Sequence, residues 1–159
     1  SFGTGHHATT HLVLKHMFDF NFQGAHVLDM GTGTGVLAVL AIKLGAEHAL
    51  AIDNNPWAFD NAGDNIKLND CEGKITVEIG ESELIEGKTF DYILANINRN
   101  VILADLPQYE KALNKKGVLL VSGIMTHDVE HVLNKAKEVG LILESLEEKD
   151  NWNLFVFKK

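Results

Sequence analysis

A glycine-rich turn between two apolar runs places the strongest constraint on the fold of this chain. The first run, Ala25–Met30, has the length of a buried strand, and the second, Gly35–Leu44, has the length of a helix. Between them lies the sequence Gly31-Thr32-Gly33-Thr34-Gly35. Glycines let the backbone turn sharply and approach a ligand closely, and a helix start offers free N–H groups. The pattern predicts a strand, a turn and a helix, and the turn is either a ligand site or purely structural.

Short apolar runs alternate with helical patterns along the rest of the chain, as in βαβ units with a mostly parallel sheet. The last two expected strands are joined by a short turn, so they must pair antiparallel. The expected fold is therefore an α/β three-layer sandwich whose seven-stranded, mostly parallel sheet ends in an antiparallel hairpin. Pro107 is expected to split one helix into two pieces. The expected strands are Ala25–Met30, Ala49–Asp53, Ile75–Ile79, Phe90–Asn96, Gly117–Ser122, Leu141–Leu146 and Trp152–Phe157, and the expected helices are Thr9–Phe20, Gly35–Leu44, Pro56–Leu68, Asn98–Leu113 and Asp128–Val139.

Composition limits the class of protein and its compartment. A chain of 159 residues with 45% hydrophobic and 23% charged residues suits one globular domain. No apolar stretch has the length that crosses a bilayer, and the first residues do not resemble a secretory signal. The single cysteine, Cys71, excludes an intrachain disulfide and fits a reducing compartment. These features predict a cytoplasmic protein without a membrane partner.

The charge balance bears on the possible partners. The formal net charge is −8, from 14 basic and 22 acidic residues, and no basic face of the kind that binds nucleic acid is visible. We therefore expect no direct contact with nucleic acid. An acidic protein is compatible with a cationic substrate such as a lysine-rich protein, although many cytoplasmic enzymes are acidic.

The spacing of the glycines indicates which ligand the turn would take. A dinucleotide-binding turn has glycines at its first, third and sixth positions. Here they stand at the first, third and fifth positions, and Val36 takes the sixth. A turn that grips a pyrophosphate is therefore less favoured than one that receives an uncharged sugar and an amino-acid end.

Two polar residues are expected at the ends of strands. Asp53 ends the second strand, where a carboxylate accepts hydrogen bonds from both ribose hydroxyls, while Asn55 is placed to cap the next helix. Asn96 ends the fourth strand, and its amide group both accepts and donates hydrogen bonds. A strand-terminal asparagine also occurs as a turn former, so this residue alone does not decide the function. Because ligands of open α/β sheets bind at the carboxyl ends of the strands, Asp53 and Asn96 are candidate ligand contacts.

Further segments carry a resemblance to a known family. They are Phe2-Gly3-Thr4-Gly5-His6-His7-Ala8-Thr9-Thr10, Val27–Ala38 around the glycine turn, Ala95-Asn96-Ile97 and Leu119-Leu120-Val121-Ser122-Gly123-Ile124. With them the chain resembles, over essentially all of its length, the Rossmann-like class I S-adenosylmethionine-dependent methyltransferases. More narrowly, it resembles the catalytic domain of the PrmA family, the methyltransferases of large-subunit ribosomal protein eleven.

The resemblance implies S-adenosylmethionine as the cofactor and indicates which residues contact it. The family pattern places cofactor contacts at Thr10, Gly31, Asp53 and Asn96, and Gly33 of the same turn is expected to join them. Without the family, Thr10 would be only one of two threonines that cap the leading helix.

Some features depart from the family pattern or extend it. The second acidic residue that often follows the second strand is replaced by Asn55, which leaves the ribose to Asp53. Glu81 and Ser82 follow the third strand, where methyltransferases commonly hold the adenine. Family members carry an N-terminal domain that recognises the ribosomal protein. We therefore expect this sequence to be a fragment of such a protein, a single domain with a leading loop and helix at 1–24 and a Rossmann-like core at 25–159.

The resemblance implies transfer of methyl groups to amines, namely lysine side chains and the N-terminal α-amine of a large-subunit ribosomal protein. A lysine ammonium must lose a proton before it attacks, and an apolar pocket favours that loss. His6 and His7 are candidate proton acceptors, although packing is the more favoured role for them. We expect Asn96 to be catalytic by orienting the amine, without a dedicated base.

Other functions stay open from the sequence. The chain is alternatively a methyltransferase for another protein or for a small molecule, or a non-catalytic nucleotide-binding domain. Enzymes that methylate release factors typically have Pro-Pro-Tyr after the asparagine, whereas Ile97-Asn98-Arg99 follows Asn96 here. No metal site is expected, because His127 is followed by Asp128 instead of the glutamate of the zinc-protease motif, although His131 lies one helical turn further on.

Overall fold

The computed structural model describes residues 5–159, with side chains from residue 8 onward. None of the helices in this part of the chain is long and apolar enough to cross a membrane. The strands are β1 (His26–Met30), β2 (His48–Asp53), β3 (Ile75–Ile79), β4 (Phe90–Asn96), β5 (Leu113–Met125), β6 (Ile142–Lys149) and β7 (Trp152–Lys158). The helices are α1 (Gly5–Met17), α2 (Val36–Lys43), α3 (Pro56–Leu68), α4 (Arg99–Ala112) and α5 (Val129–Glu138), with short 3-10 helices η1 (Ser82–Ile85) and η2 (Thr126–Asp128).

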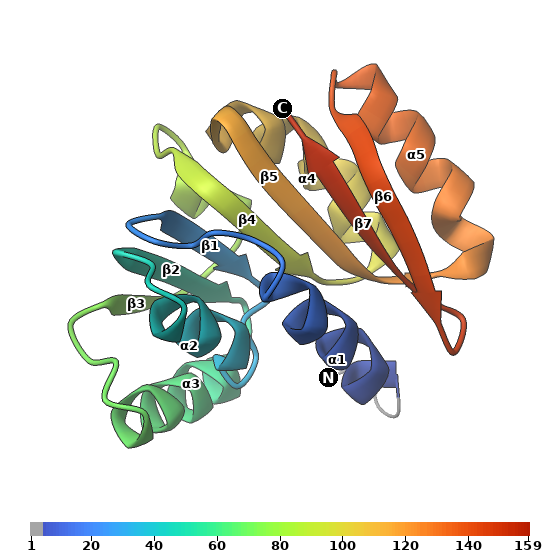
Figure 1. Cartoon of the computed structure of the whole chain (residues 1–159). Coiled ribbons are helices and arrows are strands. Elements are labelled where there is room, and N and C mark those ends of the chain that lie inside the picture. Colours follow the sequence, from blue (N-terminus) through green and yellow to red (C-terminus); the bar gives the residue numbers. More distant parts are fainter. Residues whose placement is uncertain (1–4) are drawn as a thin grey trace.

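The strands form one sheet in the order β3-β2-β1-β4-β5-β7-β6 (Figure 1). The strands β1 to β5 pair parallel, whereas β7 pairs antiparallel with both β5 and β6. The predicted mostly parallel sheet with a terminal antiparallel hairpin is confirmed. The strand order changes direction between β1 and β4, and ligands of open α/β sheets bind at such a switch point.

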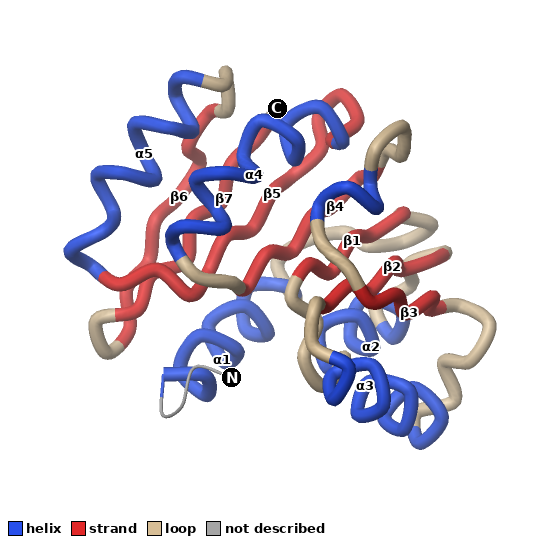
Figure 2. Tube along the Cα trace, turned by 180° about the vertical axis from the view of Figure 1, so that it is seen from behind, coloured by secondary structure: helices blue, strands red, loops and turns tan. Residues whose placement is uncertain are grey.

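Helices cover both faces of the sheet, which is the middle of three layers. One face carries α1, α2 and α3, and the other carries α4 and α5 (Figures 1 and 2). Successive residues of a strand point to opposite faces, so Leu94 of β4 packs in the core under α1 and α2, while Ile93 packs in the core under α4 and α5. The predicted three-layer α/β architecture is confirmed. Burial on both faces also explains why the central strands read as continuous apolar runs.

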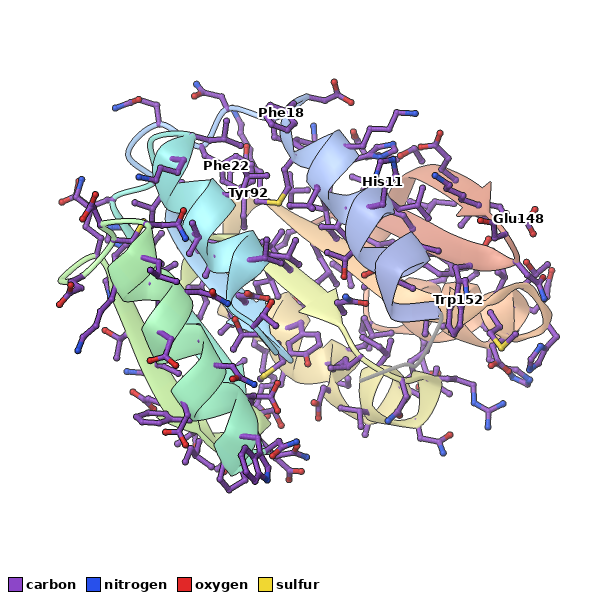
Figure 3. All side chains as sticks on the ribbon, turned by 90° about the horizontal axis from the view of Figure 1, so that it is seen from below. His11, Phe18, Phe22, Tyr92, Glu148 and Trp152 are labelled. Atoms are coloured by element: carbon purple, nitrogen blue, oxygen red, sulfur yellow. The ribbon has the colours of Figure 1, made fainter. Side chains whose placement is uncertain are left out.

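The first helix runs along the sheet from its carboxyl edge toward the start of β1. It packs against β5, β7 and α2. Figure 3 shows its first turns on the side of Trp152 and its end on the side of Phe22 and Tyr92. Trp152 pairs with Met125 at the carboxyl end of β5. The beginning of α1 therefore lies at the edge where the parallel strands end.

Most expected elements agree with the structure to within a few residues, and β3, β4 and α3 have the expected bounds. The start of α3 is explained by its cap, because Asn55 Oδ1 accepts a hydrogen bond of 3.0 Å from the N–H of Trp57, and Pro56 occupies the first helical turn. The strand β5 extends beyond the expected Gly117–Ser122 at both ends, because it already pairs with β4 at Leu113 and its pairing with β7 continues to Met125.

The expected break at Pro107 is wrong. The helix α4 runs uninterrupted from Arg99 to Ala112, with Pro107 inside it. Proline removes one backbone N–H donor, but the neighbouring Leu106 and Tyr109 are both 0% exposed and hold this turn against the core. Burial of these two side chains outweighs the loss of one hydrogen bond.

Candidate functional site

An open cavity lies at the carboxyl ends of the parallel strands, at the switch point between β1 and β4. Its volume is about 290 Å³. The ends of β1, β2 and β4 line it, together with the loop before η1 and the beginning of α4. Four of the five predicted cofactor-binding residues are among the lining residues, namely Gly31, Gly33, Asp53 and Asn96. The strand ends selected from the sequence thus meet at one cavity, and their contact with a cofactor stays a prediction.

The glycine turn requires glycine at its first position. Gly31 has a φ of 78°, in the left-handed region that favours glycine. A Cβ atom at this position would collide with Ile97 Cγ2 and would lie 3.2 Å from the carbonyl oxygen of Asn96. The N–H of Gly31 donates a hydrogen bond of 2.8 Å to the carbonyl of Ile52. The turn after β1 is therefore held between the end of β2 and the segment that follows β4, at the side of the cavity.

Asp53 is held in place by the turn that it faces. Its Oδ2 accepts a hydrogen bond of 2.9 Å from the N–H of Gly33, and its Oδ1 accepts one of 3.0 Å from the N–H of Asn55. Each carboxylate oxygen has the capacity to accept one more hydrogen bond. The carboxylate is thus fixed at the cavity with acceptor capacity for the two hydroxyls of a ribose. Because the side chain of Asn55 caps α3, that role does not require Asp53.

Asn96 brings a buried amide to the cavity. The residue is 7% exposed, and its Oδ1 has no hydrogen-bond partner in the part of the chain that the structure describes. A buried acceptor without a partner costs on the order of 1–3 kcal/mol, and native proteins contain few of them. The unpartnered oxygen fits a ligand that brings an N–H donor to the end of β4.

Thr10, the fifth predicted contact, is not among the residues that line the cavity. It lies in α1, and its Oγ1 is also buried without a hydrogen-bond partner among residues 8–159. Thr10 is the sixth of the 13 residues of α1, the helix that begins at the carboxyl edge of the sheet. The candidate proton acceptors His6 and His7 lie outside the residues whose side chains the structure describes.

A further carboxyl group at the cavity, that of Asp105, was not expected from the sequence. Glu81 and Ser82 line the cavity as well, and Ser82 Oγ donates a hydrogen bond of 3.0 Å to Asp105 Oδ1. The hydroxyl of Tyr109 donates one of 3.2 Å to Asp105 Oδ2. Burial raises the pKa of Asp105, and these two hydrogen bonds partly offset that effect. Sequence reasoning concentrated on strand ends and so missed Asp105, which lies inside α4.

Asp29 supports the glycine turn from within. The residue is 0% exposed, and its Oδ2 accepts a hydrogen bond of 2.6 Å from Thr32 Oγ1. Burial raises the pKa of Asp29 to about 6, although the hydrogen bond from Thr32 acts in the opposite direction. The pair ties the end of β1 to the turn and thereby fixes one side of the cavity.

Comparisons with known proteins identify the family of the chain. The family model described as ribosomal protein L11 methyltransferase (PrmA) matches residues 1–159. The ribosomal protein L11 methyltransferase of Porphyromonas gingivalis is 44% identical over 153 residues, which make up 96% of this chain and 52% of the relative. The chain thus spans about half the length of this curated relative.

Solved structures show the same fold. The ribosomal protein L11 methylase of Lactobacillus delbrueckii subsp. bulgaricus superposes with a TM-score of 0.89 at 28% identity, covering 95% of this chain and 78% of that one. A putative methyltransferase complexed with SAH superposes with a TM-score of 0.79 at 13% identity, covering 95% and 49%, and shares the fold alone. The sequence match over the whole chain places it more narrowly: it belongs to the ribosomal protein L11 methyltransferase (PrmA) family.

Proposed function

We propose that residues 1–159 form the catalytic domain of an S-adenosylmethionine-dependent methyltransferase that acts on ribosomal protein L11. The observation that carries the proposal is the convergence of the glycine turn, the anchored carboxylate of Asp53 and the buried amide of Asn96 at one cavity. The names of the relatives support this substrate. We place the reaction in the cytoplasm, because the buried Cys71 is a free thiol, as expected in a reducing compartment.

The residues at the cavity fit S-adenosylmethionine better than a dinucleotide. Asp53 has acceptor capacity for the ribose, and Asn96 Oδ1 receives no hydrogen bond from the described part of the chain. Among the described lining residues, Asp53, Glu81 and Asp105 are acidic and none is basic, which disfavours a pyrophosphate. Bound here, the cofactor supplies a methyl group made electrophilic by the positively charged sulfur.

The residues around Asn96 would prepare the amine of the substrate. The apolar side chains of Ile97 and Val101 also line the cavity. An apolar environment lowers the pKa of an ammonium group and so favours the neutral amine that attacks. The side-chain oxygen Oδ1 of Asn96 has two lone pairs and is able to accept hydrogen bonds from both the amine and the cofactor. Asn96 is the proposed catalytic residue because it would aim the lone pair of the amine at the methyl group.

A methyl-transfer assay tests the proposal. The chain is incubated with ribosomal protein L11 and S-adenosylmethionine that carries an isotopically labelled methyl group, and mass spectrometry locates the label. We expect label on lysine side chains and on the N-terminal α-amine of L11, and none with the Asn96→Ala variant. Intact methylation by Asn96→Ala would remove the catalytic role from this residue.

The alternatives predict different outcomes of the same assay. Label on another protein or on a small molecule, with none on L11, would support a methyltransferase with a different substrate. Binding of S-adenosylmethionine without transfer to any acceptor would support a non-catalytic nucleotide-binding domain.

A further inference from the structure

Ser122 lies at an irregularity of β5 that the proposed function does not use. In the pairing of β5 with β7, Val121 lies opposite Phe155 and Ile124 lies opposite Asn153, so β5 carries one extra residue between these pairs. Gly123 takes up the irregularity with a φ of 85°. Such bulges occur often beside functional sites, where they redirect a side chain. Ser122 is 1% exposed, and its Oγ has no hydrogen-bond partner in the described part of the chain.

The hydroxyl of Ser122 belongs to a group of three buried oxygens on one side of the sheet. Ser122 pairs in register with Asn96 of the neighbouring strand β4. Paired residues of parallel strands point to the same face, and Leu94 and Leu120, two positions earlier in each strand, pack in the core under α1 and α2. Thr10 lies on α1, which packs against β5 on this face.

The unpartnered buried oxygens of the described residues lie on this side of the sheet. Among the described residues, four side-chain oxygens are buried without a partner, and three of them are Thr10 Oγ1, Asn96 Oδ1 and Ser122 Oγ. The fourth belongs to Asp29, which pairs with Leu94 and so lies on the same side of the sheet, but its other oxygen is bonded to Thr32 within the glycine turn. Leaving polar groups buried without partners is unfavourable, so native proteins contain few of them. Asn96 lines the cavity and Ser122 pairs with it in the sheet, so these oxygens point to a ligand that completes their hydrogen bonds.

We propose that Ser122 is a further cofactor-binding residue, which together with Thr10 and Asn96 binds the amino-acid end of S-adenosylmethionine. The inference rests on the proposed function. The amino-acid end carries a carboxylate, which accepts from the hydroxyls of Thr10 and Ser122, and an ammonium group, which donates to Asn96 Oδ1. A substrate lysine that attacks as a neutral amine directs its one lone pair at the methyl group and would leave the two hydroxyl protons without an acceptor. Asp53 would hold the ribose on the other side of the glycine turn, so the two sets of contacts act on opposite ends of one ligand.

Two ligands that differ in the amino-acid end test this assignment. S-adenosylhomocysteine has the complete end, whereas 5′-methylthioadenosine keeps the adenosine and the sulfur but ends in a methyl group. Calorimetric titration with each ligand compares the wild type with Ser122→Ala. Loss of a hydrogen bond to a charged group should weaken S-adenosylhomocysteine about tenfold or more, and the affinity for 5′-methylthioadenosine should not change. Ser145→Ala, the same substitution on the exposed strand β6, is the matched control and should leave both affinities unchanged.

The thermal midpoint of the ligand-free protein gives a second readout. Removing a buried hydroxyl that has no partner should leave the midpoint of Ser122→Ala equal to or above that of the wild type. Equal affinities of Ser122→Ala and the wild type for S-adenosylhomocysteine would overturn the inference while leaving the proposed function intact. Equal weakening of both ligands would also overturn it, because Ser122 would then act through packing. A wild type that binds neither ligand would contradict the proposed function, and the inference with it.

Discussion

Replacing Asp53 by alanine removes the carboxylate that we propose to hold the ribose of S-adenosylmethionine. Its oxygens already accept hydrogen bonds of 2.9 Å from Gly33 and 3.0 Å from Asn55, which fix the side chain at the cavity. A hydrogen bond to a charged group contributes about 1.5–3 kcal/mol, so loss of two ribose contacts should weaken binding by about 3 kcal/mol or more, a factor of roughly 150. Calorimetric titration of the wild type and of Asp53→Ala with S-adenosylmethionine measures this ratio directly.

Two companion variants separate the ribose contact from other effects of the substitution. Asp60→Ala removes the same charge from an exposed position of α3 and should bind like the wild type. Asp53→Asn keeps one acceptor oxygen without the charge and should have an intermediate affinity. The two backbone hydrogen bonds are partly open to water, so Asp53→Ala should lose only about 1 kcal/mol of stability in a urea titration. Binding by a folded Asp53→Ala within about threefold of the wild type would refute the assignment of the ribose to this residue.

Two further predictions concern the glycine turn. In urea titrations the Gly31→Ala variant should be less stable than the wild type by about 1–3 kcal/mol, because the added Cβ would collide with Ile97 and the backbone there has a positive φ. Gly63→Ala, at a helical position with open space around it, should gain up to about 1 kcal/mol of stability. Equal changes in stability for the two variants would contradict the close approach of Gly31 to Ile97. Burial raises the pKa of Asp29 from 3.8 to about 6, so the ionisation of this group should cost the wild type about 3 kcal/mol of stability as the pH rises from below the first value to above the second. The amide side chain of the Asp29→Asn variant does not ionise, so in thermal unfolding the stability of this variant relative to the wild type should increase over this pH range. A difference in stability that does not change with pH would refute the burial argument.

Local sequence signals were sufficient for the order of elements and for most of the cavity. The alternation of apolar runs and helical patterns predicted the sheet, and the short connection before Trp152 predicted the antiparallel hairpin, which the pairing of β6 with β7 confirms. Asp53 and Asn96 were found because strand ends are recognisable and parallel strands bring their carboxyl ends to one edge of a sheet. These signals are local, and the geometry of a parallel sheet brings the residues that carry them close together in space.

Features that depend on tertiary packing could not be predicted from the sequence. Pro107 was expected to break a helix, and burial of its neighbours keeps the helix intact. Asp105 reaches the cavity from within α4, where a single acidic residue resembles any solvated helix position. The position of Ser122 beside Asn96 follows from the register of β4 and β5, which no local pattern specifies. Thr10 was selected by family resemblance alone, and its unpartnered hydroxyl becomes visible only in the folded structure.

The central claim is that the cavity between β1 and β4 is built for S-adenosylmethionine and not for a dinucleotide. Calorimetric titration of the purified chain with S-adenosylmethionine, and separately with NAD, tests it most directly. We predict saturable binding of S-adenosylmethionine, lost in Asp53→Ala, and no binding of NAD, because the described lining contains carboxylates and no basic side chain for a pyrophosphate. Binding of NAD without binding of S-adenosylmethionine would contradict the account.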